Sequence, residues 1–147
     1  PNPTDMSKLR DRGAKLLAYH GVSDPVFSFN DTVNLFQGLN AANRGDATAF
    51  ARLFPIPGMN HCSGGPAVDQ FDVISPLVKW VESGIAPTSI NASARGTGTN
   101  SISALINAEV PTQWAPNRTR PLCPWPQVPR YNGTGDMDAA ANFSCKS

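Results

Sequence analysis

The sequence predicts an α/β fold built on a parallel sheet, and two compact apolar runs lead to that prediction. Residues 14–20 (AKLLAYH) and 50–56 (FARLFPI) have the length and composition of buried strands, and each runs into a loop marked by Gly and Pro. A segment with helical spacing of its apolar residues follows each loop. The order strand, helix, strand, helix is typical of parallel strands that helices cover on both faces. Because two strands alone leave open edges, we expect further strands from elsewhere to complete the sheet.

Two helices are predicted around the first strand. A short helix over residues 5–12 is expected to have Thr4 as its N-cap and to end at Gly13 in a left-handed turn. A second helix is expected to begin after Ser28 or Asn30 and to end near residues 43–45. Its apolar residues recur mostly at helical spacing: Val33, Leu35, Phe36 and Leu39.

A third helix is predicted over residues 69–83, with Gly84 ending it. Pro76 implies a kink or a later start, because proline has no N–H to donate within a helix. The apolar stripe of this helix consists of Phe71, Ile74, Leu77, Val78 and Val81. From residue 86 onward we expect mostly irregular structure, with a stretch rich in Gly, Thr, Ser and Asn over residues 96–103 and then a tail dense in Pro, Trp and Arg.

Composition excludes several classes of partner. The 147 residues suit one domain with one core, and the net charge is +1, with no basic run. We therefore expect no nucleic-acid partner, and a small, weakly charged substrate fits better. No apolar run approaches the roughly 20 residues needed to cross a bilayer, so no membrane partner is expected. Residues 1–4 lack the features of a signal peptide, which places any export signal outside this chain.

The three cysteines predict one disulfide and leave one cysteine over. Cys123 and Cys145 flank the proline-rich tail, where a cross-link would stabilise the fold by restricting the unfolded chain, and we expect them to pair. Cys62 is then either a buried free thiol or bonded to a cysteine outside this sequence. Disulfides indicate the periplasm or the outside of the cell. Five sequons would accept glycans only in a eukaryotic secretory pathway: Asn30, Asn91, Asn117, Asn132 and Asn142.

Asp24 and His61 are the candidate catalytic residues. Each follows a predicted strand at its carboxyl end, where the loops of a parallel sheet aim side chains into a shared crevice. The order Asp then His, 37 residues apart, is that of the last two triad members of an α/β-hydrolase. Asp24 would fix the imidazole tautomer and stabilise its cation, while His61 would take the serine proton and later protonate the leaving alcohol. Taken singly, each has an ordinary explanation as a loop or turn residue.

No serine in this chain has the setting of a nucleophile. Ser23 and Ser63 lack the leading glycine and the strand-to-helix position of a G-x-S-x-G elbow, so we interpret both as loop serines. His20, at the end of the first strand, is the rival histidine and is expected to pack or to support other site residues. The tail aromatics either line a pocket for phenolic groups or, as we prefer, pack the tail onto the body: Trp114, Trp125 and Tyr131.

Four blocks of sequence resemble the end of the tannase and feruloyl esterase family. They are YHGVSDP at residues 19–25, PGMNHCSGG at 57–65, WVESGIAP at 80–87 and RTRPLCPWP at 118–126, in the family's order and spread over nearly the whole chain. The resemblance implies the C-terminal part of an α/β-hydrolase fold, in which the last two parallel strands with their helices precede an irregular disulfide-linked tail. Residues 1–90 would then belong to the catalytic domain, and residues 91–147 would form an extension packed on the same domain.

The resemblance also implies roles for individual residues. Asp24 would be the triad acid, His61 the base, and Cys62 the partner of a cysteine outside this chain, beside the nucleophilic serine. The N-terminal remainder of the same enzyme would supply that serine, and the substrates would be small aromatic esters such as feruloyl or galloyl esters. No cofactor or metal is implied in this chain, because the family's calcium site belongs to a lid that lies elsewhere. A secreted or periplasmic esterase is expected, and the alternative is a disulfide-stabilised binding domain without catalysis.

Overall fold

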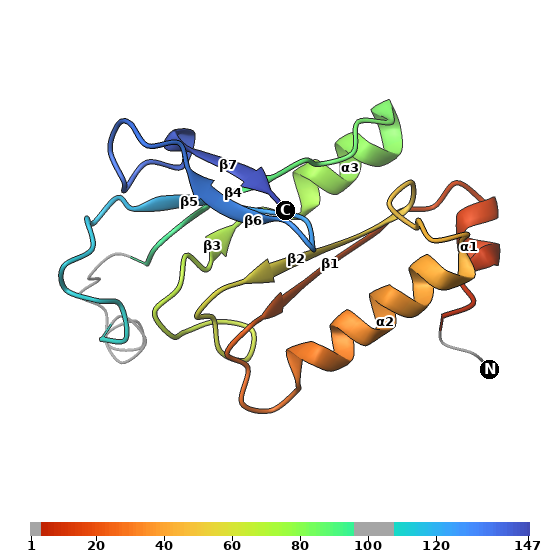
Figure 1. Cartoon of the computed structure of the whole chain (residues 1–147), viewed down its shortest axis with the longest axis horizontal. Coiled ribbons are helices and arrows are strands. Elements are labelled where there is room, and N and C mark those ends of the chain that lie inside the picture. Colours follow the sequence, from red (N-terminus) through yellow and green to blue (C-terminus); the bar gives the residue numbers. More distant parts are fainter. Residues whose placement is uncertain (1–3, 96–107) are drawn as a thin grey trace.

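The computed structural model describes residues 4–95 and 108–147, so the Gly-rich stretch at 96–103 lies outside the described residues. Figure 1 shows the elements in chain order. They are α1 (Ser7–Asp11), β1 (Leu16–Gly21), α2 (Phe29–Ala42), β2 (Ala51–Ile56), β3 (Gln70–Phe71), α3 (Ile74–Ser83), β4 (Ile90–Ser93), β5 (Thr119–Leu122), β6 (Val128–Tyr131), the 3₁₀ turn η1 (Ala140–Asn142) and β7 (Phe143–Lys146). None of the helices in these two ranges combines the length and the apolar character needed to cross a bilayer.

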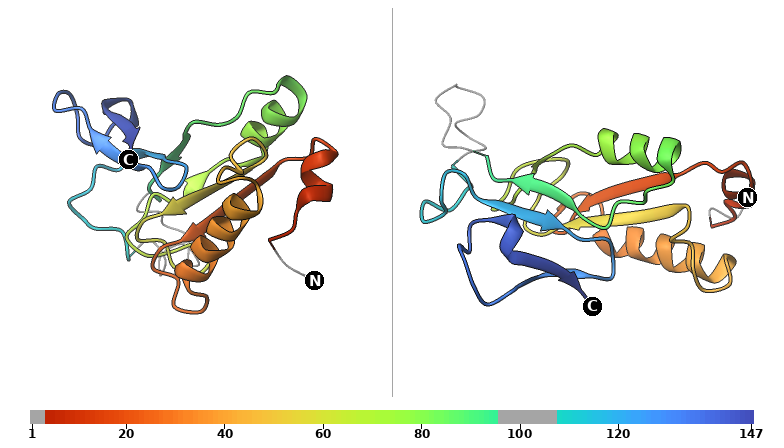
Figure 2. Two further views of the ribbon diagram at one scale, coloured as in Figure 1. Left: turned by 45° about the vertical axis from the view of Figure 1, so that its right-hand side comes forward. Right: turned by 90° about the horizontal axis from the view of Figure 1, so that it is seen from above.

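β1 and β2 form the parallel pair that the sequence predicts. Leu16 lies opposite Ala51 and Gly21 opposite Ile56, so both strands end at the same edge of the sheet. α2 lies on one side of this pair and α3 on the other, which gives the pair cover on both sides (Figure 2). The two loops that follow these strands therefore start next to each other.

Two apolar clusters occupy the two sides of β2. One joins it to α2 through Phe36, Leu39 and Leu53, and the other joins it to the antiparallel strands through Phe54 and Ile90. β2 is accordingly buried on both faces, whereas most of β1 is only partly buried. A parallel strand with both faces covered consists of a nearly continuous run of apolar residues, which is why β2 could be predicted as a strand.

The first two helices follow the predictions in part. α1 begins later than expected, and Thr4 is not its N-cap, because the Asp5 carboxylate accepts hydrogen bonds from the Ser7 hydroxyl at 2.7 Å and the Ser7 N–H at 3.3 Å. Gly13 has the expected positive φ of 73° after this helix. The expectation for α2 is confirmed, since Ser28 occupies its N-cap position and the helix ends at Ala42.

The third helix starts five residues later than predicted. Residues Gln70–Phe71 form β3 and pair with β4 instead of opening a helix. The Asp72 carboxylate accepts hydrogen bonds from the N–H groups of Ile74 and Ser75, so helical structure begins there. Pro76 falls in the first turn, where its missing N–H has no intrahelical partner to lose, and Gly84 ends the helix at φ 69°, as expected.

The apolar stripe of α3 is largely exposed, contrary to what such a stripe normally indicates. Ile74 and Val81 are 64% and 58% exposed, and Val78 is exposed as well. The buried residue of this helix is Trp80, whose ring lies within 5.5 Å of the cationic groups of Lys15 and Arg52. Within the described residues, α3 therefore turns its apolar stripe away from the core.

The described part of the tail is mostly irregular, as predicted, but it also contains short antiparallel strands that the sequence did not reveal. β3, β4 and β5 form one small sheet, and β6 pairs with β7. Strands of four residues are too short for the alternation of apolar and polar residues to stand out, so these strands could not be predicted. The expected disulfide is present: Cys123 and Cys145 are bonded, with their Cα atoms 5.5 Å apart.

The tail aromatics pack as the preferred interpretation predicts. The Arg118 guanidinium lies 4.3 Å from the ring centre of Trp114, and Trp125 packs against the cluster beneath α2. Tyr131 contacts Phe143 across the β6–β7 pair, with ring centres 5.4 Å apart. Trp114 also packs against the cluster that contains Phe54, so the two tryptophans attach the tail to the body of the protein, whereas the Tyr131 contact lies within the tail.

Candidate active site

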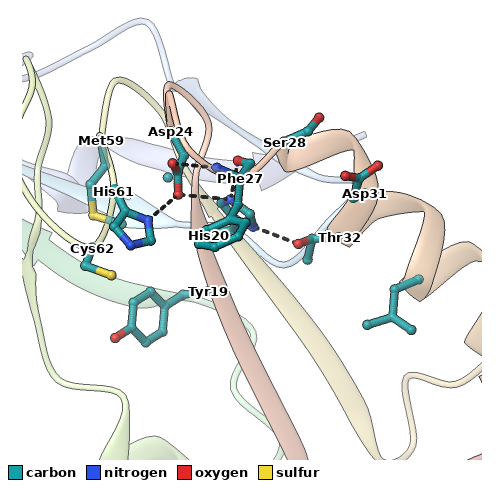
Figure 3. A pocket seen from close by; sticks show the side chains of 12 residues that line it. Tyr19, His20, Asp24, Phe27, Ser28, Asp31, Thr32, Met59, His61 and Cys62 are labelled. Carbon is teal, nitrogen blue, oxygen red and sulfur yellow. Dashed lines mark hydrogen bonds and ion pairs between the residues drawn. The ribbon is translucent and has the colours of Figure 1, made fainter. Parts of the chain in front are cut away.

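The structure brings Asp24 and His61 together at the carboxyl ends of β1 and β2. His61 Nδ1 lies 2.8 Å from Asp24 Oδ2, and the two loops meet face to face (Figure 3). Because a carboxylate only accepts hydrogen bonds, Nδ1 carries the proton in this contact. The imidazole is thus held with Nε2 on the opposite side of the ring, directed away from Asp24.

Close backbone contact between the two loops makes this meeting possible. A Cβ atom at Gly21 would lie 2.4 Å from the carbonyl oxygens of both Met59 and Asn60, so only glycine allows the two loops to come this near. Beyond Gly21, the Ser23 N–H donates to the Met59 carbonyl at 3.1 Å. Asp24 is the next residue, so it lies at the base of the loop that bears His61.

Four contacts orient the Asp24 carboxylate. Oδ1 accepts hydrogen bonds from the backbone N–H groups of Val26 at 2.8 Å and Phe27 at 3.0 Å. Oδ2 lies between two imidazoles, that of His61 at 2.8 Å and that of His20 at 3.5 Å. Only 5% of this side chain is exposed, so its charge is stabilised mainly by these groups.

The pKa of Asp24 reflects this environment. Desolvation raises the pKa, but the hydrogen bonds from His61 and from the backbone of Phe27 and Val26 together outweigh it and lower the pKa to about 2. Asp24 is therefore a stable anion at neutral pH. A carboxylate that stays ionised can hold the imidazole in one tautomer and orientation.

His61 borders an open pocket. Its side chain is 45% exposed, and the Phe27 ring lies 5.3 Å from its ring centre. The pocket has a volume of about 490 Å³ and is lined by Tyr19, His20, Gly21, Asp24, Phe27, Ser28, Asp31, Thr32, Leu35, Met59, His61 and Cys62. In the described part of the chain, no serine hydroxyl hydrogen-bonds to His61, and Ser23 and Ser63 are both exposed loop residues.

Cys62 follows His61 in an unusual conformation. It has a free, exposed thiol and a positive φ of 64°, which is uncommon for a residue with a side chain. This exposure is contrary to the first of the two expectations, a buried free thiol. The next residues of the loop turn back through Gly64 and Gly65, both with positive φ.

Acidic side chains from outside this loop hold its backbone, and the sequence did not reveal them. Asp69 accepts a hydrogen bond from the Gly64 N–H at 2.9 Å and forms an ion pair with Arg95, while Glu109 accepts one from the Gly65 N–H. Arg95 also donates to the Gly65 carbonyl at 2.8 Å. Asp69 is five residues from Gly64, but Glu109 and Arg95 lie 44 and 30 residues from Gly65, so no local spacing could have identified these two.

The described residues contain no group of three or more His, Cys, Asp or Glu side chains arranged to bind a metal. The chemistry that this arrangement can perform is proton transfer. Nε2 of His61 is the atom available to take up and return a proton, with Asp24 fixing the ring.

Comparison with known proteins identifies the family. Residues 2–146 match the family described as tannase and feruloyl esterase. The chain belongs to this family. It is 49% identical over 142 residues to the mono(2-hydroxyethyl) terephthalate hydrolase of Piscinibacter sakaiensis, and 34% identical over 148 residues to a probable feruloyl esterase of Arthroderma benhamiae.

The fold agrees with this membership. The chain superposes on the crystal structure of an esterase from Aspergillus oryzae with a TM-score of 0.77 and 29% sequence identity, over 97% of its own length. It covers 21% and 25% of the two relatives in sequence and 29% of the crystallised esterase. This family member therefore spans between a fifth and a third of the length of the proteins it matches.

Proposed function

We propose that this chain supplies the acid and the base of a Ser-His-Asp carboxylic ester hydrolase that acts on esters of aromatic acids, such as feruloyl or galloyl esters. The observation that carries the proposal is the contact between His61 Nδ1 and Asp24 Oδ2, with the rest of the His61 ring facing an open pocket. This is the arrangement of acid and base in a serine hydrolase.

The reaction assigns each residue one task. A serine hydroxyl loses its proton to His61 Nε2 as its oxygen attacks the ester carbonyl, and the leaving alcohol departs with that proton, which forms an acyl-enzyme. Water then hydrolyses the acyl-enzyme with the same histidine as base. Asp24 remains ionised throughout and stabilises the imidazolium. These steps involve no cofactor bound by this chain, and we assign no residue of it to a calcium site.

The serine is proposed to come from the N-terminal remainder of the same protein, of which this chain forms the C-terminal part of an α/β-hydrolase domain. Residues 1–90 would complete the parallel sheet, and residues 91–147 would pack on the same domain. Two features support this proposal: in the described residues β1 pairs with β2 alone, and α3 leaves apolar side chains such as Val78 exposed. An open parallel edge and an uncovered apolar helix are both costly in water.

The same arrangement suggests a role for Cys62. We propose that it forms a disulfide with a cysteine next to the nucleophile, which would tie serine and histidine together. Its exposed position beside His61 allows that bond. Together with the Cys123–Cys145 disulfide, it supports a secreted or periplasmic location.

The substrate class rests on the relatives and on the pocket. The two relatives are named for a terephthalate ester and for feruloyl esters, and both acids are aromatic. Tyr19 and Phe27, both exposed, place aromatic rings in the pocket around His61, where they would favour a flat apolar acyl group.

A serine-directed phosphonate probe tests the proposal in the intact protein. We expect the probe to label the wild type and to compete with an aromatic ester substrate. His61→Ala should lose at least about 10⁴-fold in kcat and most of the labelling, because the serine loses its base. Circular dichroism should show an unchanged fold. Full turnover by this variant would refute the assignment of His61, and the absence of labelling and turnover in the wild type would favour the binding domain without catalysis.

A further inference from the structure

A second histidine lies on the other side of the Asp24 carboxylate. His20 is the penultimate residue of β1, and its side chain is 14% exposed. Its Nε2 lies 3.5 Å from Asp24 Oδ2 and 3.2 Å from the carbonyl oxygen of Phe27. Both neighbours are acceptors, so Nε2 must carry a proton to be stable there.

The other nitrogen of His20 has a partner that fits this tautomer. Nδ1 lies 2.7 Å from the Thr32 hydroxyl, which rotates freely and can donate to an unprotonated nitrogen. The Phe29 ring packs edge-on against the imidazole, with ring centres 5.8 Å apart. A neutral His20 with its proton on Nε2 therefore satisfies every polar contact, and the ring is held by α2 on two sides.

We infer that His20 is a positioning residue for Asp24, an inference that rests on the proposed function. Thr32 fixes the His20 ring, and its Nε2, which contacts the Phe27 carbonyl at 3.2 Å, lies 3.5 Å from the oxygen that His61 also uses (Figure 3). Backbone N–H groups restrain Oδ1, whereas within the described residues the contacts to Oδ2 come from the two imidazoles. Without His20, the carboxylate can rotate out of the plane that holds His61 in its productive orientation.

Two substitutions of similar size separate the positioning role from simple packing. Glutamine places an amide nitrogen where histidine has Nε2, whereas asparagine reaches only the position of Nδ1. In the intact protein, we expect H20N to lower kcat about 10-fold with little change in KM, as outer-shell partners of active-site groups typically do. H20Q should recover kcat to within about 3-fold of wild type.

Thr32→Val provides an independent measurement. It removes the hydroxyl while keeping the shape of the side chain, and we expect a drop of about 3-fold in kcat. Combined with H20N it should cause no further loss, because both changes act through the same contact. The matched control is Thr112→Val, the same change at an exposed position of the tail, and it should leave kcat unchanged.

The outcomes distinguish this inference from the proposed function. Wild-type kcat in H20N, or equal losses in H20N and H20Q, would overturn the positioning role while the loss of turnover in His61→Ala still supported the esterase. If the wild type hydrolyses no aromatic ester, ¹⁵N spectra of the imidazoles decide the matter without activity. Two results together would support the inference: a proton on Nε2 of His20 in the wild type, and loss of the Nδ1–H form of His61 in H20N. A proton on Nδ1 of His20, or a His61 tautomer that H20N leaves unchanged, would overturn it.

Discussion

The parallel pair and the disulfide-linked tail are held together by different interactions. β2 has side chains such as Phe54 and Ile56 that are completely buried, and its order comes from apolar packing on both faces. β6 and β7 contain no buried residue. This pair is joined instead to the β5 segment, which buries Leu122 in the core, by the Cys123–Cys145 bond, an ion pair between Arg118 and Asp138, and the Arg120 guanidinium stacked on Phe143.

The candidate catalytic residues belong to the first of these two regions, the packed parallel pair. The candidate acid and base both stand at the ends of the packed parallel strands, where small shifts would separate two side chains that must lie within hydrogen-bond reach. None of the residues that line the pocket around His61 comes from the tail. Substitutions of the two site side chains should therefore reduce turnover far more than stability, and breaking the disulfide of the tail should do the opposite.

The largest effect is expected from Asp24→Asn in the intact protein. The amide keeps the size of the side chain but can donate to His61 Nδ1, which favours the wrong tautomer, so kcat should fall about 10⁴-fold. The melting temperature should fall modestly, because the ionised carboxylate also stabilises the fold. Steady-state kinetics with an aromatic ester checks this, and a loss below about 10-fold would mean that Asp24 is not the acid of the triad.

Breaking the disulfide tests the other half of the comparison. Cys145→Ser should lower the free energy of unfolding by about 3 kcal/mol, given the sequence separation of 22 between the bonded cysteines, while kcat stays near the wild-type value. Chemical denaturation measures the loss. Cys123→Ser should cost a similar amount, and the double variant little more than either, because both remove one bond. Additive losses would show that the two cysteines act separately.

The sequence was informative where the signal is local. Asp24 and His61 could be predicted to meet because each follows a recognisable apolar strand, and parallel strands bring their carboxyl ends to one edge. The N-cap of α2 at Ser28 and the ends of helices at Gly13 and Gly84 were predicted for the same reason, since turn chemistry acts within a few residues.

The features that the sequence did not reveal depend on distant partners. Residues Gln70–Phe71 belong to a strand only because β4 lies beside them, and β4 pairs with β5, nearly 30 residues further along. The Glu109 carboxylate and the Arg95 guanidinium act on the His61 loop from segments 44 and 30 residues away from Gly65. The stripe of α3 predicted a buried face, and its exposure is a property of the surroundings of the helix, which its own sequence does not encode.

A smaller loss of kcat is expected from adding a side chain where the two site loops touch. Gly21→Ala would place a methyl group against the carbonyls of Met59 and Asn60 and should destabilise the protein by about 2 kcal/mol, with a loss of kcat as the loops separate. Gly13→Ala is the matched control, because a Cβ there meets no atom within 4 Å and its cost comes from its positive φ alone, about 1 kcal/mol. It should leave kcat unchanged, and equal kinetic losses in the two variants would disprove the role of this close approach.

The smallest expected effect is a shift in the pKa of Asp24. Its pKa of about 2 lies below the ordinary value of 3.8, so the folded state binds this proton less readily than the unfolded state does. The resulting stabilisation is fully present above about pH 4 and is lost as the pH falls through about 2. Carboxyl ¹³C spectra should therefore place the Asp24 midpoint near 2, and His61→Ala should raise it, while the hydrogen bonds from Val26 and Phe27 keep it below the ordinary value. A midpoint that His61→Ala leaves unmoved would mean that the contact between the two side chains does not persist in solution.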